Sequence, residues 1–179
     1  MRTKLVLSAF LLLSAAAFAK KVNIRKQHIQ AAEAACGDPH TNFTVVRGAY
    51  MPKIAPPAPG MARVYLIETT WRNYPQLGLP LYGPTMRVGL DGRWVGATGG
   101  NSYVTFTVSA GEHHLCFWRQ SKLKSWANII FLAKLTATAG ATYYFYCPSG
   151  YNFHPYINPD EAKLLLAQAV PSVSTTEEK

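Results

Sequence analysis

Hydrophobic and polar residues alternate along much of the chain between residues 42 and 147, which is the pattern of half-buried β-strands. Val104, Phe106 and Val108, for example, are separated by threonines. Turn residues recur at intervals of roughly ten residues, and the Asp-Gly pair at 91–92 is typical of a tight hairpin. The fold class is therefore mainly β, an antiparallel β-sandwich or barrel of about seven or eight strands. The predicted strands cover residues 42–47, 62–70, 86–90, 93–97, 103–108, 112–118, 129–139 and 142–147.

Two peripheral helices are predicted at the ends of this β-region. Residues 23–36 place apolar side chains at helical spacing, and a Gly-Asp-Pro sequence ends that pattern. A second helix begins with Asn158 as its cap, Pro159 at its first position and Glu161 completing a capping box, and it runs to about Ala169. The side chains of this helix expected to face the sheet are Leu164, Leu165 and Leu166.

The first nineteen residues have the pattern of a secretory signal peptide. Arg2 and Lys4 precede an apolar run over residues 5–18, and residues 17–19 form a small-x-small cleavage site. A membrane anchor is the alternative, but spanning a bilayer takes about 20 apolar residues and this run is shorter. We expect cleavage near Ala19, a periplasmic or extracellular mature protein, and no transmembrane segment in the mature chain.

Composition divides the rest of the chain into three segments. Proline-rich sequence over residues 51–60 is typical of an extended linker. Polar residues follow the second helix, and Pro171 ends it, so we expect a flexible C-terminal tail. After the signal peptide at 1–19, the predicted segments are a helix, strand and linker at 20–60, a β-sandwich domain with its C-terminal helix at 61–170, and the tail at 171–179.

The chain is basic, with 18 Lys and Arg against 9 Asp and Glu, a net charge of +9. Removal of Arg2 and Lys4 with the signal peptide leaves 16 against 9, a net charge of +7. A basic exported protein meets anionic material outside the cytoplasm, so partners are expected among anionic envelope polymers, glycans or an envelope protein. Nucleic acid is not an expected partner, because the basic residues are scattered singly and the chain carries an export signal.

All three cysteines, Cys36, Cys116 and Cys147, follow the predicted cleavage site. An oxidising compartment favours at least one disulfide, and the odd count leaves one cysteine over. We predict the pair Cys36–Cys116, which ties the end of the first helix to the β-domain, while Cys147 shares a strand face with Tyr143 and Phe145. The alternatives are a Cys36–Cys147 pair, a Cys116–Cys147 pair, or three reduced thiols.

An ordered series of motifs over about residues 59–169 resembles a family of uncharacterised bacterial exported proteins with a domain of unknown function. This family is similar to PEGA-type domains, which are small β-sandwiches of the bacterial envelope. The resemblance implies a fold and an envelope location, brings no catalytic residue or cofactor, and supports the Cys36–Cys116 pair. The motifs are VGLDGRWVG at 88–96, NSY at 101–103, GEHHLC at 111–116, AGATYY at 139–144 and DEA at 160–162.

Adjacent histidines His113 and His114 are the best candidates for metal or catalytic chemistry. Side chains alternate along a strand, so the two imidazoles point to opposite faces and cannot grip one metal ion together. No usual zinc-ligand spacing or nucleophile motif occurs, and Glu68 and Glu112 are the only acids on predicted strands. We therefore expect no metal, no cofactor and no enzymatic activity, with a metal-binding or hydrolytic protein centred on these histidines as an alternative.

Two groups of aromatic residues with neighbouring basic residues are the candidate ligand-binding positions. Exposed aromatic rings stack on sugar faces, and adjacent Arg or Lys side chains meet anionic groups. The competing interpretation is that these rings cap the open ends of the sandwich. The main hypothesis is a non-enzymatic binding or structural module of the cell envelope, and a carbohydrate-binding module is its alternative. The candidate residues are Trp71, Tyr74, Tyr82, Trp118, Arg119 and Trp126.

Overall fold

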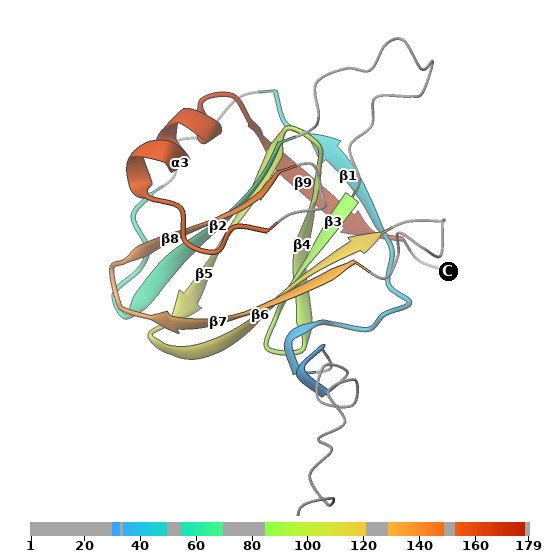
Figure 1. Ribbon diagram of the computed structural model, residues 1–179, viewed down its shortest axis with the longest axis horizontal. Coiled ribbons are helices and arrows are strands. Elements are labelled where there is room, and N and C mark those ends of the chain that lie inside the picture. Colours follow the sequence, from blue (N-terminus) through green and yellow to red (C-terminus); the bar gives the residue numbers. More distant parts are fainter. Residues whose placement is uncertain are drawn as a thin grey trace, which may run out of the picture. The chain divides into compact units, whose positions relative to one another are not determined.

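Two β-sheets form the fold in the computed structural model, which describes residues 30–32, 34–49, 55–69, 85–120, 129–148 and 153–177 (Figure 1). One sheet has five strands in the order β1 (Phe43–Arg47), β9 (Val170–Thr176), β5 (Ser102–Ser109), β2 (Met61–Thr69) and β8 (Thr142–Pro148). The other has four strands in the order β4 (Arg93–Gly99), β3 (Thr85–Leu90), β6 (Gly111–Gln120) and β7 (Ile130–Ala137). The predicted sandwich-like, mainly β fold is confirmed, with nine strands in the described ranges.

The main hydrophobic core contains side chains from both sheets. Val64 and Leu66 of β2, and Phe145 of β8, pack in one cluster with Leu115 and Phe117 of β6, and all five are fully buried. The alternation seen in the sequence produces this core, because every second residue of a strand points to the same face. The three predicted inward residues of β5 also belong to this cluster or pack against it.

A second core lies on the outer face of the five-stranded sheet. Tyr65, Ile67 and Tyr103 are buried there beneath the helix α3 (Pro159–Leu166), which Figure 1 shows next to β8 and β2. The strand β2, which lies between β5 and β8, is therefore buried on both faces over residues 64–67, where both alternating sets of side chains are apolar. This second core also places α3 beside the outward-facing residues of β8.

Two neighbouring strand pairs run parallel, namely β2 with β8 and β5 with β9, whereas the other pairs are antiparallel. The chain leaves β7 in the four-stranded sheet and enters β8 in the five-stranded one. The connecting turn is held at the start of β2, where Gly140 N donates to the Met61 carbonyl at 2.8 Å. Because β8 starts beside the start of β2, the two strands run in the same direction.

The predicted Asp-Gly hairpin joins β3 to β4. Asp91 and Gly92 have φ values of 49° and 81°, the left-handed conformations that a two-residue type I′ turn requires. The antiparallel register shifts between Val88 and Gly89, where Val95 of β4 is the extra residue of a bulge. The hairpin is therefore confirmed at its predicted residues.

The C-terminal segment differs from the predicted flexible tail of residues 171–179. Residues 170–176 form β9, which pairs antiparallel with β1 from Phe43↔Thr176 to Arg47↔Ser172. Ser174 Oγ also accepts a hydrogen bond from Ala97 N of β4 at 3.0 Å. The helix α3 already ends at Leu166, so Pro171 is not its stop but the second residue of an extended strand, and the polar residues that follow are ordered by pairing with β1.

The predicted C-terminal helix is present as α3. Asn158 caps it by accepting a hydrogen bond from Glu161 N at 2.8 Å, and Pro159 stands in the first turn. Leu165 and Leu166 pack against the outer core as predicted, but Leu164 is 68% exposed. Three consecutive helical residues span most of a turn, so they cannot all face one sheet.

Near the N-terminus, residues 31, 32, 34 and 35 are helical, within the predicted helix 23–36. Residues 31–179 form one compact unit, so the segment before β1 packs with the β-domain. The predicted signal peptide at 1–19 lies outside the described residues, as do residues 51–54 of the linker. In the part of the chain described, no helix has the length and hydrophobicity to cross a membrane.

Candidate functional site

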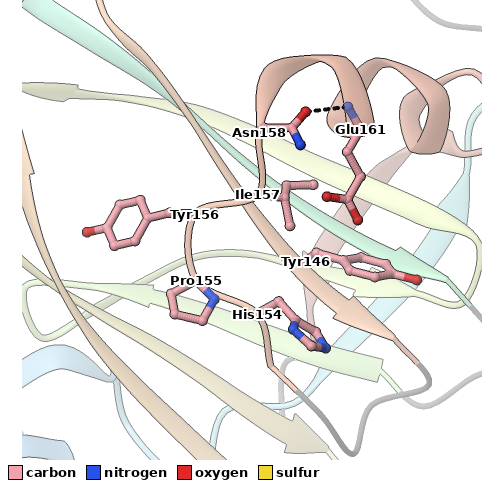
Figure 2. Close-up of a pocket in the computed structure, with 7 residues that line it drawn as sticks. All are labelled: Tyr146, His154, Pro155, Tyr156, Ile157, Asn158 and Glu161. Carbon is pink, nitrogen blue, oxygen red and sulfur yellow. Dashed lines mark hydrogen bonds between the residues drawn. The ribbon is translucent and has the colours of Figure 1, made fainter.

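A pocket of about 410 Å³ lies between β8, the segment after it and the first turn of α3 (Figure 2). Its lining combines aromatic, aliphatic and polar side chains from all three parts of the chain. We call it the β8–α3 pocket, and it is lined by Tyr146, His154, Pro155, Tyr156, Ile157, Asn158 and Glu161.

The aromatic side chains of this pocket are positioned by the alternation of side chains along β8 and by one isolated β-bridge. Phe145 points into the main core, so its neighbour Tyr146 points to the outer face. His154 then pairs antiparallel with Tyr146, with backbone N–H to carbonyl distances of 3.0 and 2.8 Å. Directly opposite residues share a face, and the two rings stack with centroids 5.9 Å apart and 26° between their planes.

Some polar side chains of the pocket have hydrogen-bonding atoms that no described residue uses. The Glu161 carboxylate and the His154 imidazole form no hydrogen bond or ion pair with any residue the structure describes. Asn158 uses its side-chain oxygen to cap α3, which leaves its amide N–H donors unused among those residues. In Figure 2 the Glu161 carboxylate points toward the Tyr146 ring. The pocket therefore offers a carboxylate acceptor, an amide group that donates and an imidazole beside aromatic surface.

Several contacts hold the walls of the pocket. The Tyr146 hydroxyl lies 2.8 Å from Thr69 Oγ1, which fixes the orientation of its ring. The Tyr156 hydroxyl donates to the Lys134 carbonyl at 2.6 Å, and its ring lies 5.1 Å from that of Phe145. These bonds join the pocket to β2, β7 and the main core, so its shape is set before a ligand binds.

The predicted ligand-binding residues that the structure describes are Trp118 and Arg119, at the end of β6. Arg119 is 4% exposed, contrary to the expectation that its guanidinium meets anionic groups at the surface. Trp118 is half-buried and packs against Trp94, with ring centroids 6.2 Å apart. Side chains at the end of a strand become enclosed where a second sheet packs beside it. The spacing of residues in the sequence does not show this enclosure. The other four candidates, Trp71, Tyr74, Tyr82 and Trp126, lie outside the described residues.

Arg87 occupies a position that the sequence analysis did not identify. Its guanidinium lies over both the Trp94 and Trp118 rings, at 4.8 and 4.6 Å from their centroids. Nη1 donates to the carbonyls of Pro39 and Thr41 at 2.9 and 2.8 Å. Arg87 therefore fastens the segment before β1 to the four-stranded sheet. The alternation that places Arg87 on the opposite strand face from Met86 and Val88 was visible in the sequence. The partners of Arg87 were not, because they depend on strand register.

The predicted disulfide Cys36–Cys116 is present, with the two Cα atoms 5.1 Å apart. It is buried with Ala35 in a small cluster, next to the Arg87 contacts. Cys147 is not part of the disulfide and is fully buried in the main core beside Phe145, as its strand position predicted.

The two histidines of β6 occupy different environments. His113 Nδ1 lies 2.7 Å from Asp91 Oδ2, and its Nε2 lies 2.9 Å from the Ser109 carbonyl, whereas the His114 side chain is exposed. Asp91 also accepts from His114 N at 2.8 Å. His113 and Asp91 thus stabilise the hairpin turn. Across the described ranges, no group of three or more His, Cys, Asp or Glu residues could hold a metal ion.

Of the two strand acids, Glu112 is exposed and Glu68 has no exposed surface. Thr98 Oγ1 donates to Glu68 Oε2 at 2.5 Å. Burial raises the pKa of Glu68 to about 8, against the opposing effects of the Thr98 hydrogen bond and the charge of Arg119. An enclosed carboxyl cannot reach a substrate in solution, so Glu68 has a structural role.

No protein-family model, curated protein or solved structure significantly matches the chain.

Proposed function

We propose that the protein is an exported, non-enzymatic binding module of the bacterial cell envelope, and that its ligand site is the β8–α3 pocket. The observation that carries the proposal is the set of unused polar groups in that pocket. Other candidate groups, including His113, Glu68 and Arg119, are either bonded to the fold or buried within it. Glu161 and His154 are instead directed to a space that a ligand can enter.

Export is supported by the buried disulfide Cys36–Cys116. Disulfides persist in oxidising compartments and are rare in the cytosol, so a disulfide as part of a buried cluster fits an exported protein. The predicted signal peptide at 1–19 and the resemblance to exported proteins related to PEGA-type domains support the same location.

The two alternative functions have less support. The metal or hydrolytic alternative needs His113 and His114 in one site, but their side chains diverge and His113 is bonded to Asp91. The carbohydrate site predicted in the loops stays a prediction from the sequence, because four of its residues lie outside the described ranges. These residues are Trp71, Tyr74, Tyr82 and Trp126.

Co-sedimentation with isolated envelope fractions tests the proposal. The mature chain, residues 20–179, is compared with a His154→Ala/Glu161→Gln variant at low and high salt, and Asp160→Asn serves as a control with the same charge change as Glu161→Gln. Asp160 is the neighbour of Glu161 on α3 but pairs with Lys163 at 3.0 Å and does not line the pocket.

We expect retention of the wild-type protein and the control to survive high salt, and retention of the pocket variant to fall several-fold. Retention that salt abolishes equally in all three proteins would show that net charge alone causes it. That result, or no retention of the wild-type protein at either salt concentration, would contradict the proposal.

A further inference from the structure

The β8–α3 pocket combines an aromatic wall with hydrogen-bonding groups of both kinds. Tyr146 and His154 present two rings whose planes differ by 26°, and Pro155 and Ile157 add apolar surface. Glu161 supplies an acceptor and Asn158 supplies donors. A sugar ring has this same division, because its C–H face is apolar while each hydroxyl group both donates and accepts.

We propose that the pocket binds one uncharged hexopyranose unit of a glycan, stacked on the wall of Tyr146 and His154, with its hydroxyl groups bonded to Glu161 and Asn158. This inference rests on the proposed binding function and names its ligand class. It uses none of the loop aromatics identified from the sequence.

Charge disfavours an anionic ligand at this site. An anionic sugar such as a uronic acid would meet the Glu161 carboxylate, with Asp160 beside it in the first turn of α3. The Asn158 amide donors need an acceptor atom on the ligand, which a bare cation lacks. An uncharged ring satisfies the acceptor and the donors together.

Size and exposure match one unit of a longer chain. A volume of about 410 Å³ is at the small end of ligand pockets. His154, Pro155, Asn158 and Glu161 are all exposed at its rim. The rest of a glycan can therefore continue into solvent on either side of the bound ring.

The pocket is also organised in advance. The backbone bridge between Tyr146 and His154 and the Tyr146 hydroxyl contact with Thr69 hold the aromatic wall. The cap interaction with Glu161 N holds the Asn158 side chain. The freedom lost on binding is therefore mainly that of the Glu161 side chain, which favours affinity in a shallow site.

NMR titration of ¹⁵N-labelled mature protein with three probes tests the inference. The probes are cellotetraose, the N-acetylglucosamine tetramer and tetragalacturonate. We expect at least one neutral tetrasaccharide to shift resonances across residues 154–161, and tetragalacturonate to bind at least about tenfold more weakly.

Variants assign the binding to named groups. Glu161→Gln should weaken binding of the neutral sugar by about tenfold, because a hydrogen bond to a charged acceptor is lost. Tyr146→Ala removes the ring and should abolish binding, whereas Tyr146→Phe keeps the ring, loses only the hydroxyl contact with Thr69 and should weaken binding by less. Asp160→Asn should have no effect, and thermal unfolding checks that each variant is folded.

Three results overturn the inference. The first is no binding of either neutral sugar up to about 10 mM. The second is tetragalacturonate binding as tightly as the neutral sugars. The third is an equal effect of Asp160→Asn and Glu161→Gln. Pocket-dependent retention on envelope fractions without sugar binding would overturn this inference and leave the binding module standing. Sugar binding at the pocket without envelope retention would leave this inference standing and contradict the envelope location in the proposed function.

Discussion

Glu68 is a carboxyl group enclosed in the sandwich, and its protonation is coupled to folding. Burial raises its pKa from the ordinary 4.5 to about 8. The folded state therefore binds this proton more tightly than the unfolded state does. The stability that Glu68 contributes is fully present below pH 4.5 and is lost as the pH rises through about 8.

We predict that Glu68→Gln removes this pH dependence, because glutamine keeps the shape and the acceptor for Thr98 without ionising. Between pH 5 and 8 the free energy of unfolding of the wild type should fall, relative to the variant, by on the order of 1.4 kcal/mol per pH unit. Urea denaturation across this range measures the difference. A constant difference between the two proteins would show that Glu68 does not titrate in this window.

His113 and Asp91 form a second titrating pair, at the surface. Partial burial lowers the pKa of His113, but the hydrogen bonds to Asp91 and the Ser109 carbonyl, together with the charge of Asp91, outweigh this and the net shift is upward. Burial raises the pKa of Asp91, but its hydrogen bonds to His113 and His114, together with the electrostatic attraction to both histidines, outweigh this and the net shift is downward. The shared bond thus favours the charged form of each group.

Asp91→Asn should lower the pKa of His113, as measured by NMR titration of its ring protons. Asparagine tolerates the φ value of 49° at this turn, so the hairpin is kept while the charge is removed. Glu112→Gln is the matched control, because Glu112 is the sequence neighbour of His113 on the opposite strand face. The same shift in both variants would mean that general charge, and not the bond to Asp91, sets the pKa.

At the level of elements, β3 supports the chain segment that enters β1. Gly89 lies against the backbone of that segment, where an added Cβ would stand 2.7 Å from the Ala35 carbonyl oxygen and 2.9 Å from Cys36 Cα. Gly99, at the end of β4, would instead place a Cβ 3.3 Å from a methyl group of Val45. A backbone held by the disulfide cannot move away as a side chain can.

Gly89→Ala is therefore expected to lower the free energy of unfolding by about 1–3 kcal/mol, the usual cost of overpacking. Gly99→Ala is the control and should cost about 1 kcal/mol or less, because the Val45 side chain can adjust. Urea denaturation of both variants compares them. Equal effects would indicate that the segment before β1 packs loosely on β3.

Most elements were predictable because their signals are local. Alternation located eight strands, and the cap residues Asn158 and Pro159 located the start of α3. The strand β9 was missed because its sequence is polar apart from Val170 and Val173, and its structure depends on pairing with β1. The burial of Arg119 was also not predicted, because it too depends on contacts between segments that are far apart in the sequence.

For the molecule as a whole, β9 joins the two halves of the five-stranded sheet. It pairs with β1 on one side and with β5 on the other, through Ser102↔Val170 and Tyr103↔Pro171. The Ser172 hydroxyl also donates to Ser102 Oγ at 2.6 Å. Without β9, the strand β1 has no partner in the sheet order.

Ending the chain after Ala169 should therefore lower the free energy of unfolding by about 3 kcal/mol or more, since several net hydrogen bonds of about 1 kcal/mol each are lost. A chain that ends after Glu177 keeps β9 and is the control. Thermal and urea unfolding of the two truncated proteins compares them with the full chain. Equal stability of all three proteins would support the flexible tail at residues 171–179 that the sequence predicted.

The sequence by itself determined the mainly β class, the hairpin at Asp91 and Gly92 and the cap of α3, because period, turn chemistry and capping are properties of neighbouring residues. It favoured the Cys36–Cys116 pair but left other pairings open, because those cysteines are 80 residues apart. Only the tertiary structure decided the parallel pairing of β2 with β8, the enclosure of Glu68 and the meeting of Tyr146, His154 and Glu161 in one pocket. Those features depend on which strands become neighbours. That choice is made by burial across the whole chain, where each sheet covers the apolar face of the other.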